Sequence, residues 1–305
     1  MKPKIILAGG SGFIGQALAP MLTARGYDVV VLGRGNSRVV DGVTHLQWEG
    51  KTVGDWAQAL DGARAIVNLA GKNIDCRHTP DNRAEIVRSR VDSVRVLGDA
   101  IARCAVPPQV VVQASATGFY GDTGDRAVDE NAASGSDFMA EVCRQWEGAF
   151  EPLPLPGTRK VVLRIGFVLG REGGALKVLE KLTRVFLGSA VGNGRQFISW
   201  IHLADLCRII IAAIEKPEFA GVFNATAPEP VTNSELMREL RHVLHRPWVP
   251  PVPAPLARAG AWLMGSEGDL ALLSYRCVPR RLIEHEFEFT LPDLKAALAD
   301  LYHDA

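Results

Sequence analysis

The amino-terminal segment from Ile5 to Gly15 constrains the fold more than any other part of this chain. It joins a short apolar run to a helical pattern through glycines at positions 9, 12 and 15. In this pattern the first glycine permits a tight turn, the second lets the backbone approach a pyrophosphate, and the third lets the helix pack closely. N–H groups at the start of the helix then face the phosphate charge. An ordinary strand–turn–helix unit is the alternative, but the context favours dinucleotide binding by Gly9, Gly10, Ser11, Gly12, Phe13, Ile14 and Gly15.

Short apolar runs alternate with helical patterns through the first two thirds of the chain. The alternation predicts a parallel sheet with helices on both faces, and right-handed crossovers place the ligand beyond the carboxyl ends of the strands. We therefore expect an α/β fold with a Rossmann-type doubly wound parallel sheet. The predicted strands are Lys4–Ala8, Asp28–Leu32, Val43–Trp48, Ala65–Leu69, Gln109–Ala114 and Lys160–Val168, and the predicted helices are Gln16–Arg25, Glu85–Cys104 and Phe138–Phe150.

The composition changes after Gly170, where glycine- and proline-rich stretches separate short elements. Helical patterns over Ala175–Leu187, Ser234–Leu244 and Leu256–Met264 are too small to fold alone, so we expect a smaller mixed cap over the cleft. The expected division is a Rossmann domain over residues 1–170 and 200–228 and a carboxy-terminal cap domain over residues 171–199 and 229–305.

Charge and composition exclude several classes of partner. The 305 residues hold 34 Lys plus Arg and 34 Asp plus Glu, so no net charge attracts nucleic acid or an acidic membrane. No apolar run is long enough to span a bilayer, and the first segment is predicted to be a strand, not a signal peptide. The five cysteines form no Cys-x-x-Cys pair and the seven histidines do not cluster, which predicts reduced thiols, a cytoplasmic location and no metal site. We expect a small-molecule substrate. The sequence does not decide between a monomer and a homodimer.

The residues after the second predicted strand bear on the choice of cofactor. In dinucleotide folds an acidic residue there accepts hydrogen bonds from the adenosine ribose of NAD. Here the strand ends in Gly33 and Arg34, and a guanidinium suits a 2′-phosphate. This favours NADP(H) over NAD(H), with both residues in the cofactor site. The alternative is that Arg34 is a solvated loop residue.

Two further segments are candidates for the cofactor site. Small residues at the end of the fourth strand let backbone approach the adenosine and pyrophosphate, namely Asn68, Leu69, Ala70 and Gly71. Downstream, Glu85 and Arg90 lie on adjacent turns of one predicted helix, so that Arg90 could reach the cofactor and Glu85 orient it. An exposed charge pairing between the two is the alternative.

Taken together, these motifs resemble the extended short-chain dehydrogenase/reductase superfamily, and within it the atypical epimerase family of nucleoside-diphosphate-sugar epimerase-like proteins. The resemblance covers nearly the whole chain, and its last two segments are similar to the carboxy-terminal region characteristic of that family. It implies a Rossmann core that carries NADP(H), a small cap, and cofactor contacts that include Ser115, Ile165, Gly166 and Phe167. The matching segments are Gly9–Gly15, Asn68–Gly71, Ser89–Arg90, Ser115–Gly121, Trp146–Glu147, Arg164–Gly170, Gly192–Gln196, Ser199–Asp205, Asn224–Asn233 and Val278–Leu282.

The chain departs from the superfamily at the residues that usually carry the chemistry. The usual set is a Ser/Thr hydroxyl after strand five and a Tyr-x-x-x-Lys pair on the next helix, whose lysine lowers the pKa of the tyrosine. Alignment puts Ala116 at the hydroxyl position and Met139 and Cys143 at the pair, so the usual mechanism is absent. Ile198 replaces the arginine that grips the phosphates of a nucleotide sugar, so such a sugar loses its expected anchor.

Three side chains remain as catalytic candidates. Tyr120 lies just beyond strand five, near the expected nicotinamide, and Ser115 and Thr117 could orient a carbonyl. The alternatives are that Tyr120 lines the pocket with its hydroxyl bonded to backbone, and that the other two hydroxyls satisfy the strand end. We therefore expect an NADP(H)-binding oxidoreductase or epimerase-like enzyme that acts on a small, unidentified metabolite. The alternative function is a non-catalytic NADP(H)-binding sensor or partner-binding protein.

Overall fold

The computed structural model describes residues 2–303, so residue 1 and residues 304–305, at the outer limits of the two expected domains, lie outside the described residues. At the centre of the molecule lies an eight-stranded sheet in the order β11-β7-β6-β5-β1-β2-β4-β3. Neighbouring strands are parallel except β3 and β4, which form an antiparallel hairpin at one edge. The doubly wound parallel sheet is thereby confirmed. The strands are β1 (Lys4–Ala8), β2 (Asp28–Gly33), β3 (Arg38–Val40), β4 (Val43–Gln47), β5 (Ala65–Asn68), β6 (Val110–Ala116), β7 (Arg159–Ile165) and β11 (Gly221–Ala225).

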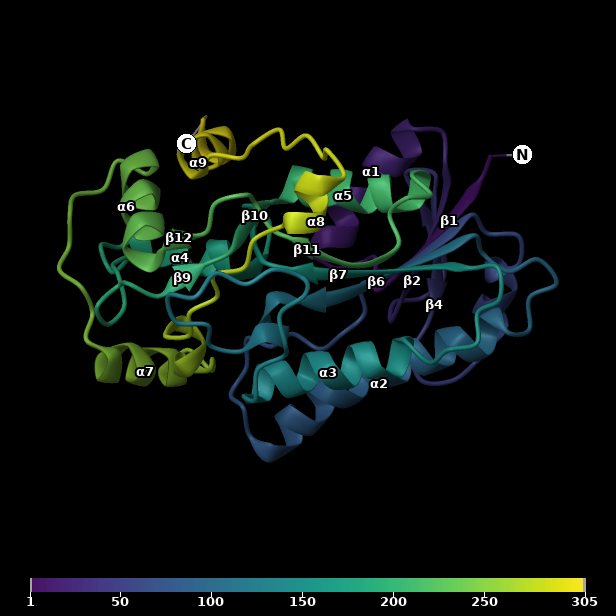
Figure 1. The fold of residues 1–305 in the computed structure, drawn as a ribbon, viewed down its shortest axis with the longest axis horizontal. Coiled ribbons are helices and arrows are strands. Elements are labelled where there is room, and N and C mark those ends of the chain that lie inside the picture. Colours follow the sequence, from purple (N-terminus) through teal and green to yellow (C-terminus); the bar gives the residue numbers. More distant parts are fainter. Residues whose placement is uncertain (1, 304–305) are drawn as a thin grey trace.

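Helices cover both faces of this sheet (Figure 1). The side chains of a strand alternate between two cores, so Ile5 packs with α1 and α5 whereas Ile6 packs with α2 and α3. Burial on both faces explains why the strands are almost continuously apolar. These helices are α1 (Phe13–Ala24) and α5 (Leu203–Glu215) on one face and α2 (Pro80–Ile101) and α3 (Phe138–Phe150) on the other.

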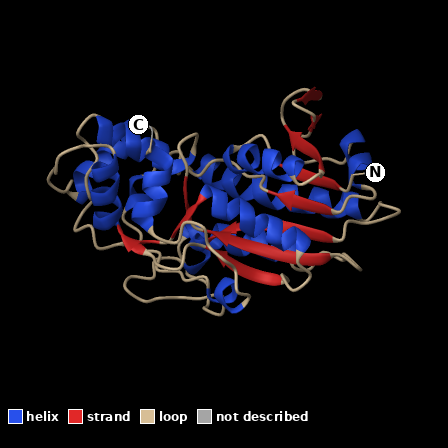
Figure 2. Cartoon of the chain, turned by 90° about the horizontal axis from the view of Figure 1, so that it is seen from above, coloured by secondary structure: helices blue, strands red, loops and turns tan. Residues whose placement is uncertain are grey.

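The carboxy-terminal part of the chain builds a smaller mixed domain beside the sheet. Three of its helices share one apolar core around Leu176, Leu236 and Leu298. Figures 1 and 2 place the two ends of the chain at opposite ends of the molecule. The elements of this region are α4 (Gly174–Arg184), α6 (Asn233–Val243), α7 (Ala254–Leu263) and α9 (Leu294–Tyr302), with β8 (Phe167–Leu169) paired to β10 (Trp200–His202) and β9 (Phe197–Ile198) paired to β12 (Val231–Thr232). Short 3-10 turns are η1 (Asp55–Leu60), η2 (Thr117–Tyr120) and η3 (Gly268–Ala271).

One short segment near the carboxy terminus returns to the large sheet. α8 (Arg280–Glu284) lies against β11, and its Leu282 is buried in the same core as α1 and α5. Arg281 fastens this segment by donating to the backbone oxygens of Ala220 at 2.9 Å and Val222 at 2.7 Å. The limits of the two domains stay a prediction.

The predicted strand Lys160–Val168 is wrong in its second half. β7 ends at Ile165, and after Gly166 the chain starts β8, which pairs with β10 and not with the large sheet. The cause is a close approach of two backbones, in which Phe167 N–H donates to Ser199 O at 2.7 Å. A Cβ at Gly166 would lie 2.3 Å from that oxygen, so the crossing requires glycine.

The start of α5 is anchored by two buried polar residues. His202 caps the helix by accepting the N–H of Ala204 at its Nδ1, 3.2 Å away. Asp205 accepts the N–H groups of Thr290 and Leu291, both at 2.9 Å, and so ties the segment before α9 to this helix. His202 therefore stabilises the start of α5, and Asp205 joins this helix to the carboxy-terminal region.

Within residues 2–303, no helix is both long and apolar enough to cross a membrane. The same residues contain no group of three or more His, Cys, Asp or Glu side chains that could hold a metal ion.

We expect Gly15→Ala to lower the free energy of unfolding by about 2 kcal/mol, because an overpacked site must shift. The added Cβ would lie 2.3 Å from Gly10 O. Gly148→Ala in α3 is the matched control: its Cβ would meet nothing within 4 Å, so the variant should gain up to about 1 kcal/mol from helix propensity. Chemical denaturation measures both. A stability change of the same sign in the two variants would contradict the close contact at Gly15.

We expect the free energy of unfolding to fall as the pH drops below about 6.5, the usual pKa of histidine. Burial lowers the pKa of His202 and outweighs the opposing charges of Asp300 and Asp205. The unfolded chain therefore takes up a proton first, and stability is lost until the pH reaches the lower pKa of the folded protein. His202→Asn keeps a cap acceptor that does not titrate, so urea unfolding over a pH series should give a flatter profile. An unchanged profile in this variant would assign the dependence to other groups.

Candidate functional site

The carboxyl ends of β1, β2 and β5 meet where the strand order reverses, which is the usual ligand position in a doubly wound sheet. Gly9 makes the turn after β1 with a φ of +74°, and its N–H donates to Leu32 O at 2.9 Å. A Cβ at Gly9 would lie 2.9 Å from the Cα of Ala70, so only glycine fits between the ends of β1 and β5. The tight turn predicted at Gly9 is confirmed.

The amino terminus of α1 lies at this edge and has no side-chain cap. Gly12 occupies the cap position, and the first turn of the helix holds no acidic residue. An added Cβ at Gly12 would contact only Gly9 O, at 3.4 Å, so the space outside it is open. Because the first N–H groups of a helix have no intrahelical acceptor, they form a cradle for an anion such as a pyrophosphate. The shape of this loop fits a dinucleotide.

The end of β2 lies beside this cradle. A Cβ at Gly33 would be 3.0 Å from the Oγ of Ser11, so these two predicted cofactor residues are neighbours. Arg34 follows with an exposed side chain that makes no hydrogen bond, ion pair or ring contact within residues 2–303. An unpaired guanidinium in this place has the chemistry to bind a 2′-phosphate.

Asn68 supports the site from within the core. Its amide nitrogen donates to Ser93 Oγ at 3.2 Å and to Gln113 Oε1 at 2.9 Å, and its Oδ1 accepts the N–H of Ala70 at 3.1 Å. The Asn68 side chain is fully buried. It therefore fixes the Leu69–Ala70 backbone that faces Gly9, and its own polar atoms are already used.

Arg90 lies behind Gly71 at the same edge. A Cβ at Gly71 would be 3.0 Å from the Cζ of Arg90, whose Nη1 donates to Lys72 O at 3.0 Å. Burial lowers the pKa of Arg90 to about 10. The alternative pairing of Glu85 with Arg90 is wrong, because the Glu85 carboxylate forms an exposed ion pair with Arg88 at 2.7 Å. Residues three apart share a helix face more closely than residues five apart. A contact of Glu85 with the cofactor stays a prediction.

A buried polar network occupies the carboxyl ends of β6, β7 and β11. Arg164 of β7 donates to both carboxylate oxygens of Glu147 on α3, at 3.0 and 2.8 Å. Ser115 Oγ donates to the same carboxylate at 2.6 Å. Arg164 also donates to the hydroxyl of Tyr120 at 2.9 Å, and that hydroxyl donates to Asn224 Oδ1 at 2.7 Å. Both buried charges are thus paired and hydrogen-bonded, as a stable buried ion pair requires.

These contacts give Tyr120 and Ser115 structural roles, and their catalytic roles stay predictions. Tyr120 is only 2% exposed, and its hydroxyl both donates and accepts a hydrogen bond. Burial raises the pKa of Tyr120 far above its usual value, against the smaller opposing effect of Arg164. The prediction that the Tyr120 hydroxyl bonds to backbone is wrong, because the side chains of Asn224 and Arg164 bind this hydroxyl. A substrate oxygen could accept the O–H of either residue only by breaking a hydrogen bond of this network.

The turn after β6 keeps one hydroxyl without a partner. Thr117 lies in η2 and makes no hydrogen bond through its side chain within the described part of the chain. Met139 and Cys143 of α3 face this turn, where a Cβ at Gly118 would lie 3.2 Å from Met139 Cβ and 3.8 Å from Cys143 Sγ. Burial raises the pKa of Cys143 to about 11, so the thiol stays protonated. Apolar volume therefore fills the place of the usual Tyr-x-x-x-Lys pair.

The predicted segment Ile165–Phe167 forms the next part of the same edge. Gly166 lies between β7 and β8, and a Cβ there would be 2.9 Å from the Cγ2 of Thr226, at the end of β11. The Thr226 hydroxyl is buried without a hydrogen-bond partner among the described residues. This segment therefore joins the sheet to the small domain beside the expected nicotinamide position.

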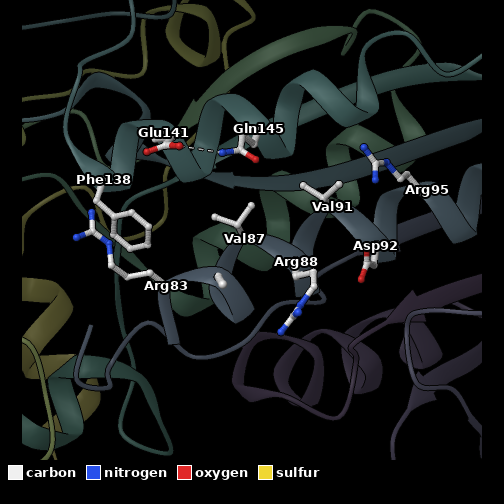
Figure 3. A pocket seen from close by; sticks show the side chains of 10 residues that line it. Arg83, Val87, Arg88, Val91, Asp92, Arg95, Phe138, Glu141 and Gln145 are labelled. Atoms are coloured by element: carbon white, nitrogen blue, oxygen red, sulfur yellow. Dashed lines mark hydrogen bonds between the residues drawn. The ribbon is translucent and has the colours of Figure 1, made fainter. Parts of the chain in front are cut away.

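A surface groove between α2 and α3 lies away from these residues (Figure 3). It has a volume of ≈ 540 Å³. The guanidinium of Arg83 lies 4.1 Å from the centre of the Phe138 ring, and Gln145 donates to Glu141 at 3.1 Å. No predicted cofactor or catalytic residue lines this groove.

No motif in the sequence predicts a role for Glu147, Arg164 or Asn224. One signal was available for Arg164, a single charge that follows the apolar run Val161–Leu163 inside a predicted buried strand. Such a charge must be paired. No local signal identifies its partners, because Glu147 lies 17 residues away and Tyr120 lies 44 residues away in the chain.

Comparison with known proteins gives matches over nearly the whole chain. The NAD dependent epimerase/dehydratase family matches residues 5–225, and a domain of unknown function, DUF1731, matches residues 252–301. The chain is 36% identical over 299 residues to the Epimerase family protein SDR39U1 homolog, chloroplastic, of Arabidopsis thaliana, which covers 96% of this chain and 85% of the relative. It is 34% identical over 304 residues to the Epimerase family protein YfhF of Bacillus subtilis, with 98% of each chain covered.

A solved structure also matches. The crystal structure of human epimerase family protein SDR39U1 (isoform2) with NADPH superposes with a TM-score of 0.88 and 31% identity, over 99% of this chain and 100% of that one. These matches confirm the resemblance expected from the motifs.

We expect Tyr120→Phe to lower the free energy of unfolding by about 2 kcal/mol, because it leaves a buried guanidinium N–H and an amide oxygen without their partner. Tyr27→Phe is the matched control, since the exposed Tyr27 hydroxyl donates to Glu215 at 3.0 Å and its loss should cost less than about 0.5 kcal/mol. Chemical denaturation measures both variants. Equal effects in the two would contradict the structural role of the Tyr120 hydroxyl.

Proposed function

Because the chain belongs to the NAD dependent epimerase/dehydratase family, we propose that it is an NADP(H)-dependent oxidoreductase or epimerase-like enzyme. In this proposal the cofactor crosses the carboxyl ends of β1, β2 and β5, with its pyrophosphate on the first N–H groups of α1. The observation that carries the proposal is the glycine cradle. A side chain at Gly9 or Gly15 would collide with backbone, and one at Gly12 would fill the open space.

Arg34 supports NADP(H) over NAD(H) as the cofactor. It is exposed at the end of β2 and makes no contact of its own within the described residues, so its guanidinium is available to a 2′-phosphate. The human relative of known structure was crystallised with NADPH.

When bound, the nicotinamide donates or accepts a hydride. The chain itself must orient the cofactor, exclude water and handle the accompanying proton. Of the three expected candidates only Thr117 has a hydroxyl without a partner in the described residues. The proposed substrate is a small metabolite and not a nucleotide sugar, because Ile198 lies in β9 against the apolar core of the small domain where an arginine is expected.

A non-catalytic NADP(H)-binding sensor is the second candidate function. It is favoured by Met139 and Cys143 in place of the usual pair and by the Tyr120 hydroxyl, which is bound on both sides. Nicotinamide absorbance followed across a panel of carbonyl compounds and alcohols separates the two functions. Turnover of any compound supports the enzyme, whereas firm NADPH binding without turnover supports the sensor.

The remaining proposals concern the subcellular location of the protein and its binding partners. We propose a cytoplasmic protein, in keeping with five cysteines that are all free thiols. Assembly as a homodimer and the lack of nucleic-acid and membrane partners stay predictions.

We expect Arg34→Ala to weaken NADPH binding about 10- to 100-fold, since charge-assisted hydrogen bonds contribute about 1.5–3 kcal/mol. NADH binding should change less than about twofold, because NADH has no 2′-phosphate. Arg103→Ala removes the same charge from an exposed residue just after α2 and should leave both affinities unchanged. Calorimetry measures the four constants. Equal loss of NADPH and NADH affinity in Arg34→Ala would contradict recognition of the 2′-phosphate.

A further inference from the structure

Of the four tyrosines of this chain, one has a hydroxyl that forms no hydrogen bond within the described residues. Three tyrosine hydroxyls donate to side chains: Tyr27 to Glu215, Tyr120 to Asn224, and Tyr302 to Glu180. The hydroxyl of Tyr275 makes no hydrogen bond within residues 2–303, although its side chain is half-buried. A half-buried phenol without a partner is a group available to a ligand.

The backbone around Tyr275 is fixed on both sides. Tyr275 N–H donates to Phe197 O at 2.8 Å, and its carbonyl oxygen accepts the Ser199 hydroxyl at 2.7 Å. On the other side, Thr123 N–H donates to Ser274 O at 2.8 Å and Thr123 Oγ1 accepts Arg276 N–H at 2.9 Å. The segment therefore lies between the turn region after β6 and the strand β9, and its side chains have set directions.

The Tyr275 side chain packs beside the turn that follows β6. Tyr275 and Cys277 are two residues apart in an extended segment, so they share one side, and both pack in a cluster with Tyr120, Val128 and Phe119. Burial raises the pKa of Tyr275, and the nearby Asp137 and Cys143 raise it further. Gly118, next to Phe119 in this turn, faces Cys143, which stands where the superfamily places its lysine. The Tyr275 side chain, which packs with Phe119 and Tyr120, therefore lies near the usual position of the acid/base pair.

We propose that Tyr275 is the hydrogen-bond donor to the oxygen of the bound substrate, supplied by the carboxy-terminal domain to the nicotinamide end of the cleft. This inference rests on the proposed function, because it takes the cofactor site at the glycine cradle as given. The phenol stays protonated near neutral pH and presents its O–H to a carbonyl or alcohol oxygen. The residue lies within the region that matches the domain of unknown function, and so gives that region a chemical role in this chain.

The test uses the full chain labelled with 3-fluorotyrosine, whose four ¹⁹F resonances are assigned with Tyr→Phe variants. NADP⁺ and NADPH differ only at the nicotinamide ring. We expect the Tyr275 resonance to differ between the two loaded forms, while those of Tyr27 and Tyr302 stay the same. Acetamide, an unreactive carbonyl compound, should then move the Tyr275 resonance of the NADPH-loaded protein in a saturable way.

Calorimetry on the same samples separates the possible failures. Tyr275→Phe should keep its NADPH affinity within about twofold, because the hydroxyl is assigned to the substrate and not to the cofactor. Normal binding with identical Tyr275 resonances in both loaded forms, or no response to acetamide, overturns this inference and leaves the proposed function standing. Absence of heat with either nucleotide overturns both.

Discussion

The buried ion pair between Arg164 and Glu147 is the constraint on which the rest of the candidate site depends. Their side chains are 6% and 14% exposed. Removing one partner of such a pair costs about 3–5 kcal/mol, because the other charge stays buried. Every remaining donor and acceptor must also be satisfied, and that requirement recruits Ser115 to the carboxylate and Tyr120 to the guanidinium. The hydroxyls at the end of β6 are therefore used to hold α3 and three strands together.

The parts of the fold with local causes could be predicted from the sequence. α3 runs from Phe138 to Phe150 as expected, because Asp137 accepts the N–H of Ala140 and an apolar stripe follows. The glycine loop was equally accessible, since Gly9 and Gly15 are required by contacts within a short stretch of chain or with the adjacent strand. The missed hairpin strand β3 has only three residues, all exposed, and is too short to show an alternation of apolar and polar side chains.

Features of the fold and the site that depend on residues far apart in the chain could not be predicted from the sequence. The acceptor of the Tyr120 hydroxyl is Asn224, 104 residues later in the chain, so the sequence could not identify this side chain as its partner. The end of β7 at Gly166 is decided by Ser199, and no local pattern marks that crossing. Tyr275, by contrast, is given no role by the sequence. It lies in a region of weak secondary structure, and its position becomes informative only when the backbone contacts to Phe197 and Thr123 are known.

Besides Arg281 of α8 and the segment bound by Asp205, two further contacts join the carboxy-terminal region to the sheet domain. The segment around Tyr275 lies beside the end of β6, while Arg77 donates to Trp262 O at 2.9 Å and His78 N–H donates to Glu267 at 3.4 Å. A side chain held by the first contact can face the reacting end of the cofactor without belonging to the domain that binds it. In the superfamily's usual arrangement the tyrosine and lysine of the acid/base pair lie on one helix of the sheet domain. Here the donor we infer comes from the carboxy-terminal domain, so the proposed contact to the substrate depends on how this domain packs against the end of β6.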